Sequence, residues 1–284
     1  MIVRRAGQVG ASSWQRAPAR AWYSPLALDA IAPLELLLLC LAALGAGVVD
    51  AIAGGGGLIT LPALLSTGLP PHLALGTNKG QSVFGSFAAL VRFARGGMVD
   101  GGLARWTFPL GLVGALLGAA LVMALEPEVL KPLVIVLLLA VALFLAFRRS
   151  PPPGGHPVPP RQRLLALGGM AALVIGAYDG FFGPGTGTFL IIAFSGLLGH
   201  TLSRASADAK VVNFASNLAS VALFASRGVV LWQVALPMAA AQFTGGWIGA
   251  HLAVRGGDTL VRKVVLGVVI ALVLKLGRDV LVGG

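Results

Sequence analysis

Hydrophobic residues divide the chain into long apolar segments separated by short polar ones. A helix that crosses a bilayer needs about 20 mostly apolar residues. Several stretches reach that length without any Asp, Glu, Lys or Arg: Trp106–Leu125, Gly180–Ser203 and Gly228–Val254. A membrane β-barrel has a different pattern, with hydrophobic and polar residues alternating in segments of about 10. The pattern therefore predicts an all-α polytopic membrane protein.

The apolar segments form two series of five. They cover 33–52, 58–67, 73–94, 103–125 and 129–147 in the first half, and 164–182, 187–199, 206–226, 231–253 and 260–280 in the second. Segment 58–67 is too short to cross, because ten helical residues rise only about 15 Å. We expect it and its counterpart 187–199 to be re-entrant half-helices, which leaves eight full spans.

The two halves resemble each other in sequence. Two pairs of segments carry the likeness: Gly47–Gly57 with Gly176–Thr186, and Thr77–Val99 with Asp208–Val230. The alignment places Asp50 opposite Asp179 and Lys79 opposite Lys210. Internal duplication of this kind is typical of secondary transporters. Four spans in each half predict parallel repeats, whereas five, if the short segments crossed, predict inverted ones.

Composition agrees with a membrane protein and excludes a nucleic-acid binder. The chain is 57% hydrophobic and 11% charged, with a mean hydropathy of +0.89, whereas soluble domains average about 25% charged residues. The net charge of +11 comes from arginines in short polar segments, which is the pattern of cytoplasmic loops. The predicted partners are therefore the lipid bilayer and a small anionic substrate, and no nucleic acid.

The polar segments suggest four parts of the chain. Residues 1–32 form a basic cytoplasmic tail, 33–147 a first transmembrane repeat, 148–163 a Pro/Gly/Arg linker on the cytoplasmic side, and 164–284 a second repeat. Both termini are predicted to be cytoplasmic. Arg255, Arg262 and Lys263 fall on the opposite side in this topology and are its exceptions.

No motif for an enzyme, a metal or a cofactor is apparent. The glycine run at 54–57 lacks the Lys–Ser/Thr that follows in a phosphate-binding loop. Cys40 is the single cysteine, and the four histidines are scattered without the spacing of a zinc site. We therefore expect a protein that is not an enzyme and has no cofactor.

Two glycine-rich breaks follow the aligned aspartates. A broken helix at membrane depth is tolerated only where it is buried or lines a cavity, and glycines let backbone N–H groups converge on an anion beside a helix N-terminus. Alternatively, the glycines serve only to let helices pack closely through small residues. Two breaks at matching positions favour a binding site. Its candidate residues are Gly55, Gly56, Gly57, Gly185 and Thr186.

Two of the five lysines occupy equivalent positions inside apolar segments. Each begins a polar stripe at helical spacing: Lys79, Ser82 and Ser86 in one half, and Lys210, Asn213 and Asn217 in the other. A cation beside neutral donors suits an oxyanion. Alternatively, each lysine extends to the membrane surface or pairs with a structural acid. Asn78, Gln81 and Gln242 are weaker candidates that could join helices.

The aligned aspartates, Asp50 and Asp179, allow three interpretations. They could carry a coupling proton, because burial raises the pKa of a carboxyl group. They could neutralise Lys79 and Lys210. They could also cap the broken backbone, which is a common task of Asp at a helix break. The sequence does not decide among these.

The segments DAIAGGGGLITLPALL…GLPPHLALGTNKGQSVFGSFAA and YDGFFGPGTGTFL…RASADAKVVNFASNLA resemble the two signature halves of the sulfite exporter TauE/SafE family, also called the toluene sulfonate uptake permease family. The likeness covers about residues 33–280. It implies a prokaryotic inner-membrane transporter, most simply an exporter, for sulfite or organosulfonates such as sulfoacetate. It also supports a substrate near the glycine breaks and the two lysines.

Other assignments stay open at this stage. The substrate could be another small anion such as a carboxylate, and a membrane-embedded enzyme acting on lipid phosphates is a third interpretation. Such an enzyme needs clustered acids or histidines at one interface, which this chain lacks. The direction of transport, the coupling ion and the choice between monomer and homodimer are not determined by the sequence.

Overall fold

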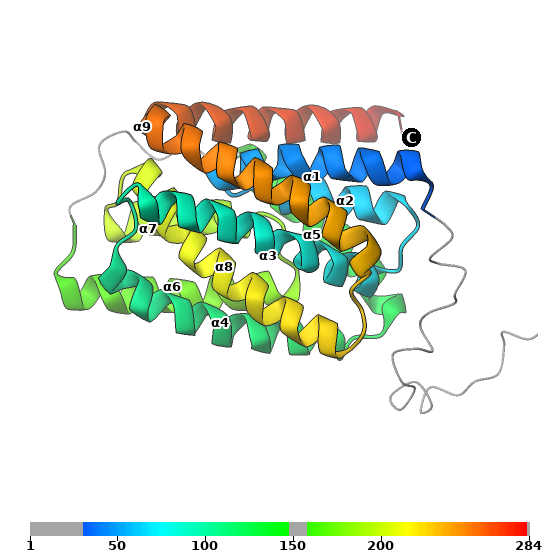
Figure 1. Ribbon diagram of the computed structural model, residues 1–284, viewed down its shortest axis with the longest axis horizontal. Coiled ribbons are helices and arrows are strands. Elements are labelled where there is room, and N and C mark those ends of the chain that lie inside the picture. Colours follow the sequence, from blue (N-terminus) through cyan, green and yellow to red (C-terminus); the bar gives the residue numbers. More distant parts are fainter. Residues whose placement is uncertain (1–30, 148–157, 283–284) are drawn as a thin grey trace, which may run out of the picture.

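The computed structural model describes residues 31–147 and 158–282, and all regular structure in these residues is helical (Figure 1). The helices are α1 (Pro33–Ala53), α2 (Gly57–Ser66), α3 (Pro71–Arg95), α4 (Gly101–Met123), α5 (Pro127–Phe147), α6 (Arg161–Phe181), α7 (Thr186–Leu198), α8 (Leu202–Ser226) and α9 (Trp232–Val282). The last of these bends sharply at Gly257, whose φ of 55° is not helical. Most of the predicted tail and most of the predicted linker lie outside the described residues.

Glycines end the first helix of each half. Gly54 follows α1 with a φ of 79°, and Gly183 follows α6 with a φ of 97°. Side chains other than that of glycine rarely adopt this left-handed backbone. The chain therefore turns out of each helix at the predicted break, and a short helix begins within a few residues.

Each short helix returns toward the end of the bundle where the preceding long helix began (Figure 1). The end of α2 lies in one hydrophobic cluster with the first half of α1, through Leu64 and Leu39. In the second half, Leu198 at the end of α7 packs beside Gly168 near the start of α6. The pairs α1–α2 and α6–α7 are thus helical hairpins, as expected for re-entrant segments.

The equivalent helices of the two halves run in opposite directions. Close glycine contacts make α1 parallel to the first part of α9, and α4 parallel to α6. The start of α6 lies beside the start of α4, where Arg161 pairs with Asp100 at 2.8 Å, whereas α1 begins at the other end of the bundle (Figure 1). Four spans per half predicted that the two halves run in parallel. In the structure they run in opposite directions, which is the inverted arrangement given as the alternative.

This arrangement also corrects the predicted sidedness. The sequence analysis placed the tail 1–32 and the linker 148–163 on the same side of the membrane. The start of α1, which follows the tail, and the start of α6, where the linker ends, lie at opposite ends of the bundle (Figure 1). They cannot both face the cytoplasm if the bundle crosses a bilayer. The difference arises because the predicted topology counts α1 as a complete crossing, whereas α2 brings the chain back toward the end where α1 begins.

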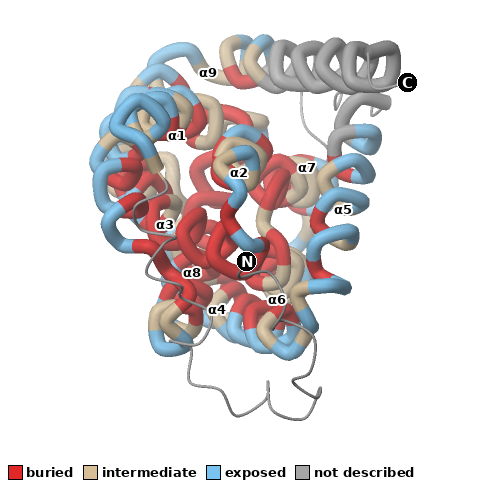
Figure 2. The backbone as a smooth tube through the Cα atoms, turned by 90° about the vertical axis from the view of Figure 1, so that its right-hand side faces the viewer, coloured by how far each residue is buried: buried red, intermediate tan, exposed pale blue. Residues whose placement is uncertain are grey.

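The outer surface of the bundle is apolar. Three described helices, α1, α4 and α6, are long and apolar enough to span a bilayer, and α2 and α7 are shorter apolar helices. Large hydrophobic side chains such as Leu38, Leu117 and Val136 face outward, while the buried residues fill the interior (Figure 2). So extensive an apolar surface is typical of contact with lipid, which is consistent with a polytopic membrane protein.

Candidate functional site

The two glycine breaks touch each other at the centre of the bundle. A Cβ added at Gly54 would lie 2.1 Å from the carbonyl carbon of Gly187, so only two glycines allow this approach. Thr188 joins the breaks through two bonds: its N–H donates to the Gly54 carbonyl at 3.3 Å, and its hydroxyl donates to the Ala53 carbonyl at 2.8 Å. Hairpins that enter from opposite ends therefore meet tip to tip.

A small polar cavity lies at this meeting point. Its volume is about 30 Å³, enough for water, which needs about 10–15 Å³, but too small for an organic anion. The cavity is therefore narrow in this conformation. Its lining comes from both breaks and five long helices: Asp50, Gly54, Gly57, Asn78, Lys79, Ser82, Asp179, Gly183, Thr186, Gly187, Asn213, Asn217 and Gln242.

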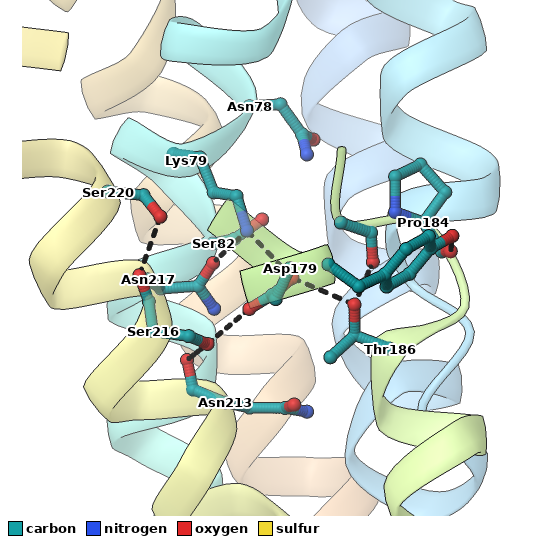
Figure 3. A network of polar contacts seen from close by, with 12 residues as sticks. Asn78, Lys79, Ser82, Asp179, Pro184, Thr186, Asn213, Ser216, Asn217 and Ser220 are labelled. Atoms are coloured by element: carbon teal, nitrogen blue, oxygen red, sulfur yellow. Dashed lines mark hydrogen bonds and ion pairs between the residues drawn. The ribbon is translucent and has the colours of Figure 1, made fainter. Parts of the chain in front are cut away.

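Lys79 and Asp179 form the best-connected ion pair of the cavity (Figure 3). The Lys79 ammonium donates to Asp179 Oδ1 at 2.7 Å and to Asn217 Oδ1 at 3.1 Å. Asp179 accepts two more bonds, from the Thr186 hydroxyl to Oδ1 at 2.9 Å and from Ser216 to Oδ2. The carboxylate thus connects three helices and the beginning of α7.

Lys210 and Asp50 form a second pair that is connected more loosely. Lys210 Nζ lies 2.8 Å from Asp50 Oδ2, and the lysine is fully buried while the aspartate side chain is 18% exposed. The other carboxylate oxygen accepts a long 3.3 Å bond from the Gly56 N–H. Lys210 is not among the lining residues, so Asp50 stands between its ammonium and the cavity.

Both pairs join one half of the chain to the other. Lys79 of the first half pairs with Asp179 of the second half. Asp50 of the first half pairs with Lys210 of the second. The aspartates therefore neutralise the lysines, which was one of three interpretations from the sequence. They also bond to the breaks, through the Gly56 N–H and the Thr186 hydroxyl. The contacts leave proton coupling untested.

The structure brings most of the candidate residues to the cavity. Nine of them line it: Asp50, Gly57, Asn78, Lys79, Ser82, Asp179, Thr186, Asn213 and Asn217. The other six lie in the surrounding shell and do not line it: Gly55, Gly56, Gln81, Ser86, Gly185 and Lys210. Within that shell, Gln81 donates to Asn78 at 3.0 Å, and Ser86 accepts from Asn217 at 3.4 Å.

Some residues of the site were not singled out from the sequence. Ser216, which bonds to Asp179, lies three positions after Asn213 and so continues the same helical face. Gly54, Gly183 and Gly187 line the cavity beside the predicted glycines. The helical spacing could have indicated Ser216, but no pattern within one break indicates which glycine touches the other break.

The cavity also contains polar groups that the protein does not use fully. The amide oxygens of Asn213 and Gln242 are buried and have no hydrogen-bond partner among the described residues. The terminal torsion of such an amide is broad and roughly two-fold, so either group can turn its NH2 toward a ligand. Buried polar groups without partners are rare and often have a functional reason.

An apolar helical bundle with a buried, charged centre defines the class of multi-pass membrane proteins that move polar solutes. The family of the sulfite exporter TauE/SafE matches residues 39–276. The chain therefore belongs to this family and is a membrane transporter. No group of His, Cys, Asp or Glu that could hold a metal occurs among the described residues.

Relatives support the assignment over most of the chain. A probable membrane transporter protein from Haemophilus influenzae is 42% identical over 225 residues, which is 78% of this chain and 86% of the relative. A second from Sinorhizobium is 39% identical, covering 86% and 93%. The probable membrane transporter protein YfcA from Escherichia coli is 36% identical, covering 83% and 87%. The names agree with the expectation of a protein that is not an enzyme. No solved structure matches the chain.

Proposed function

We propose that the protein is a secondary transporter of small sulfur-containing anions such as sulfite or organosulfonates. One observation carries the proposal: the Lys79 ammonium lies in a small polar cavity where two broken helices meet. An ammonium among neutral donors is suited to an oxyanion. The family description adds sulfite as the chemical class.

The anion is expected to bind beside Lys79, with donors from the long helices. Ser82, Asn213 and Asn217 line the same cavity, and their hydroxyl and amide groups can donate to sulfonate oxygens. Since the cavity is too small for such an anion, binding requires the hairpin tips to move apart. Movement of one hairpin at a time would open the site toward one side of the membrane, as alternating access requires.

We further propose a multi-pass arrangement with inverted repeats in a prokaryotic inner membrane, with the linker end of the bundle in the cytoplasm. Basic residues gather at that end: Arg92, Arg95, Arg105, Arg161, Arg163, Arg204, Arg255 and Lys263. The opposite end carries Lys131 and Arg227, and Lys275 and Arg278 belong to the last part of α9, which ends there. Cytoplasmic loops are enriched in such residues. The arginines of the N-terminal tail favour the other orientation, but they are fewer. Arg255 and Lys263 are no longer exceptions.

A ligand-binding measurement tests the proposed substrate. Purified protein in detergent is heated with sulfite, thiosulfate, sulfoacetate or taurine, each at several concentrations and constant ionic strength. A ligand at about 100 times its Kd stabilises the folded state by about 2.7 kcal/mol, so a true substrate raises Tm with concentration. Chloride is the control for a general salt effect. The carboxylates acetate and succinate test the alternative substrate class, and a larger shift with them than with every sulfur anion would refute the proposal.

A further inference from the structure

The charges at the cavity are balanced before any anion enters. Lys79 and Lys210 supply two positive charges, and Asp50 and Asp179 supply two negative ones. Lys210 reaches the site through Asp50, and apart from Asp50, Lys79 and Asp179 no Asp, Glu, Lys, Arg or His lines the cavity. A bound monoanion would therefore leave one negative charge without a partner in a largely buried site. Such a charge is strongly unfavourable unless a neighbouring group is neutralised.

The two carboxylates are not equally able to lose their charge. Asp179 accepts bonds from Lys79, Thr186 and Ser216, and its side chain is 5% exposed. Asp50 has Lys210 and one long bond from the Gly56 N–H, and its side chain is 18% exposed. Protonating Asp179 would disturb three partners, whereas protonating Asp50 disturbs one strong contact.

The surroundings of Asp50 agree with this difference. Lys210 on α8 faces it directly, and Lys79 on α3 and Asp179 on α6 share its cavity. The residue of α9 that lines the cavity is Gln242, which is neutral. The entering anion repels the Asp50 carboxylate and favours its protonated form, while Lys79 and Lys210 remain charged.

We propose that Asp50 takes up one proton from solution when a monoanion binds, so that the anion and the proton cross the membrane together without net charge. In this step a hydronium ion transfers its proton to a carboxylate oxygen of Asp50. The anion then replaces that carboxylate as the second negative charge of the site, and both ammonium groups keep their protons. The proposal rests on the proposed function and identifies the coupling ion and the residue that carries it.

Binding at different pH values tests the proposal. The probe is methanesulfonate, which stays a monoanion throughout the range, and its Kd is measured by calorimetry on the purified protein between pH 5 and pH 9. Uptake of one proton with the anion means that affinity falls as pH rises, approaching tenfold per pH unit where Asp50 is ionised. Asp50→Asn is neutral at every pH, so its Kd should be constant and, at high pH, lower than that of the wild type.

Asp258→Asn is the matched control. Asp258 accepts hydrogen bonds from Ser203 at the end of the bundle, away from the cavity, and an asparagine can still accept them. This variant should keep the pH dependence of the wild type. A wild-type Kd that does not change with pH, or a slope that survives in Asp50→Asn, would overturn the proposal. A pH dependence of Kd that is lost in Asp179→Asn but kept in Asp50→Asn would also overturn the proposal.

Transport supplies an independent readout. In proteoliposomes, a proton gradient with an acidic exterior should drive methanesulfonate uptake, whereas a potassium diffusion potential should not, because the combined movement carries no net charge. Uptake driven by the potential would overturn the inference and leave the proposed function standing. Failure of the wild type to bind methanesulfonate at every pH would contradict the proposed sulfonate site itself, and the inference with it.

Discussion

At the residue scale, the Lys79–Asp179 pair is part of the candidate site and also part of the framework that holds it. Both side chains are almost fully buried, and the pair connects the two halves of the chain. A buried ion pair adds little net stability when compared with apolar residues of the same shape, but removal of one partner leaves an uncompensated charge. The two lysines cannot therefore be tested as simple ligands of the anion.

The first prediction concerns this pair. Lys79→Met and Asp179→Asn should each destabilise the folded protein, by about 3–5 kcal/mol if the remaining charge stays buried. The double variant should be less destabilised than the sum of the two changes, because it leaves no unpaired charge. Thermal unfolding of the purified variants in detergent measures these differences.

An exposed ion pair provides the control. Arg161 and Asp100 lie 2.8 Å apart, a distance similar to the 2.7 Å between Lys79 and Asp179, but the arginine side chain is 50% exposed. The Arg161 hydrogen bond holds the pKa of the Asp100 carboxyl group well below its usual range. Exposed pairs contribute at most about 1 kcal/mol, so Arg161→Met should have a small effect. If Lys79→Met were equally mild, the Lys79–Asp179 pair would not be structural.

At the element scale, the hairpin tips decide where the site lies. The chain leaves α1 through Gly54 and leaves α6 through Gly183, both in left-handed conformations. Contact between Gly54 and Gly187 brings the tips together, and the cavity lies beside this contact. Any side chain at the contact would separate the halves and open the cavity.

The second prediction separates this contact from backbone strain. Gly54→Ala should prevent normal packing, because its Cβ would lie 2.1 Å from Gly187. Gly68→Ala is the matched control: Gly68 has a φ of 81°, close to that of Gly54, but no atom lies within 4 Å of the added Cβ. Its backbone strain costs about 1–2 kcal/mol.

Expression level and the size-exclusion profile provide the measurement. Gly68→Ala should elute as a single peak with a moderately lower Tm, and Gly54→Ala should aggregate or elute heterogeneously. Equal behaviour of the two variants would mean that the left-handed backbone, and not the contact between tips, is the critical requirement.

The breaks show how far a sequence can predict this structure. The glycine runs and the aligned aspartates predicted where α1 and α6 end, and the polar stripe from Lys79 predicted one wall of the cavity. The crossed pairing of Lys79 with Asp179 was not predictable, because hydropathy does not show whether the long helix before a break crosses the membrane completely or forms a hairpin with the short helix. That single choice sets the direction of every later helix. Arg255 and Lys263, which contradicted the predicted topology, were the available signal for the correct direction.

At the scale of the whole molecule, opposite directions of the two halves fix which chain ends share a side. The start of α1 and the last residues of α9 lie at one end of the bundle, and the start of α6 lies at the other (Figure 1). We propose that this end faces the cytoplasm, because positive charge gathers near α6. The arrangement therefore makes a prediction about sidedness that differs from the one based on sequence.

The third prediction is accessibility to a thiol reagent that does not cross membranes. In a Cys40→Ser background, Ser150→Cys should react only after the inner membrane is permeabilised, and Gly284→Cys should react in intact spheroplasts. Both positions reacting from the same side would contradict the opposite directions of the halves. The Cys40→Ser protein without a new cysteine shows the background reaction.

Because each ion pair joins the first half of the chain to the second, the pairs also affect how the protein is made. Synthesis delivers Asp50 and Lys79 to the membrane before Asp179 and Lys210 have left the ribosome. Unpaired charges at membrane depth are unfavourable, so the first half cannot reach its final state alone. We expect it to wait beside the insertion machinery until the second half arrives. Closing of the two ion pairs is then a late event in biogenesis, and the connecting segment keeps the halves together until it happens.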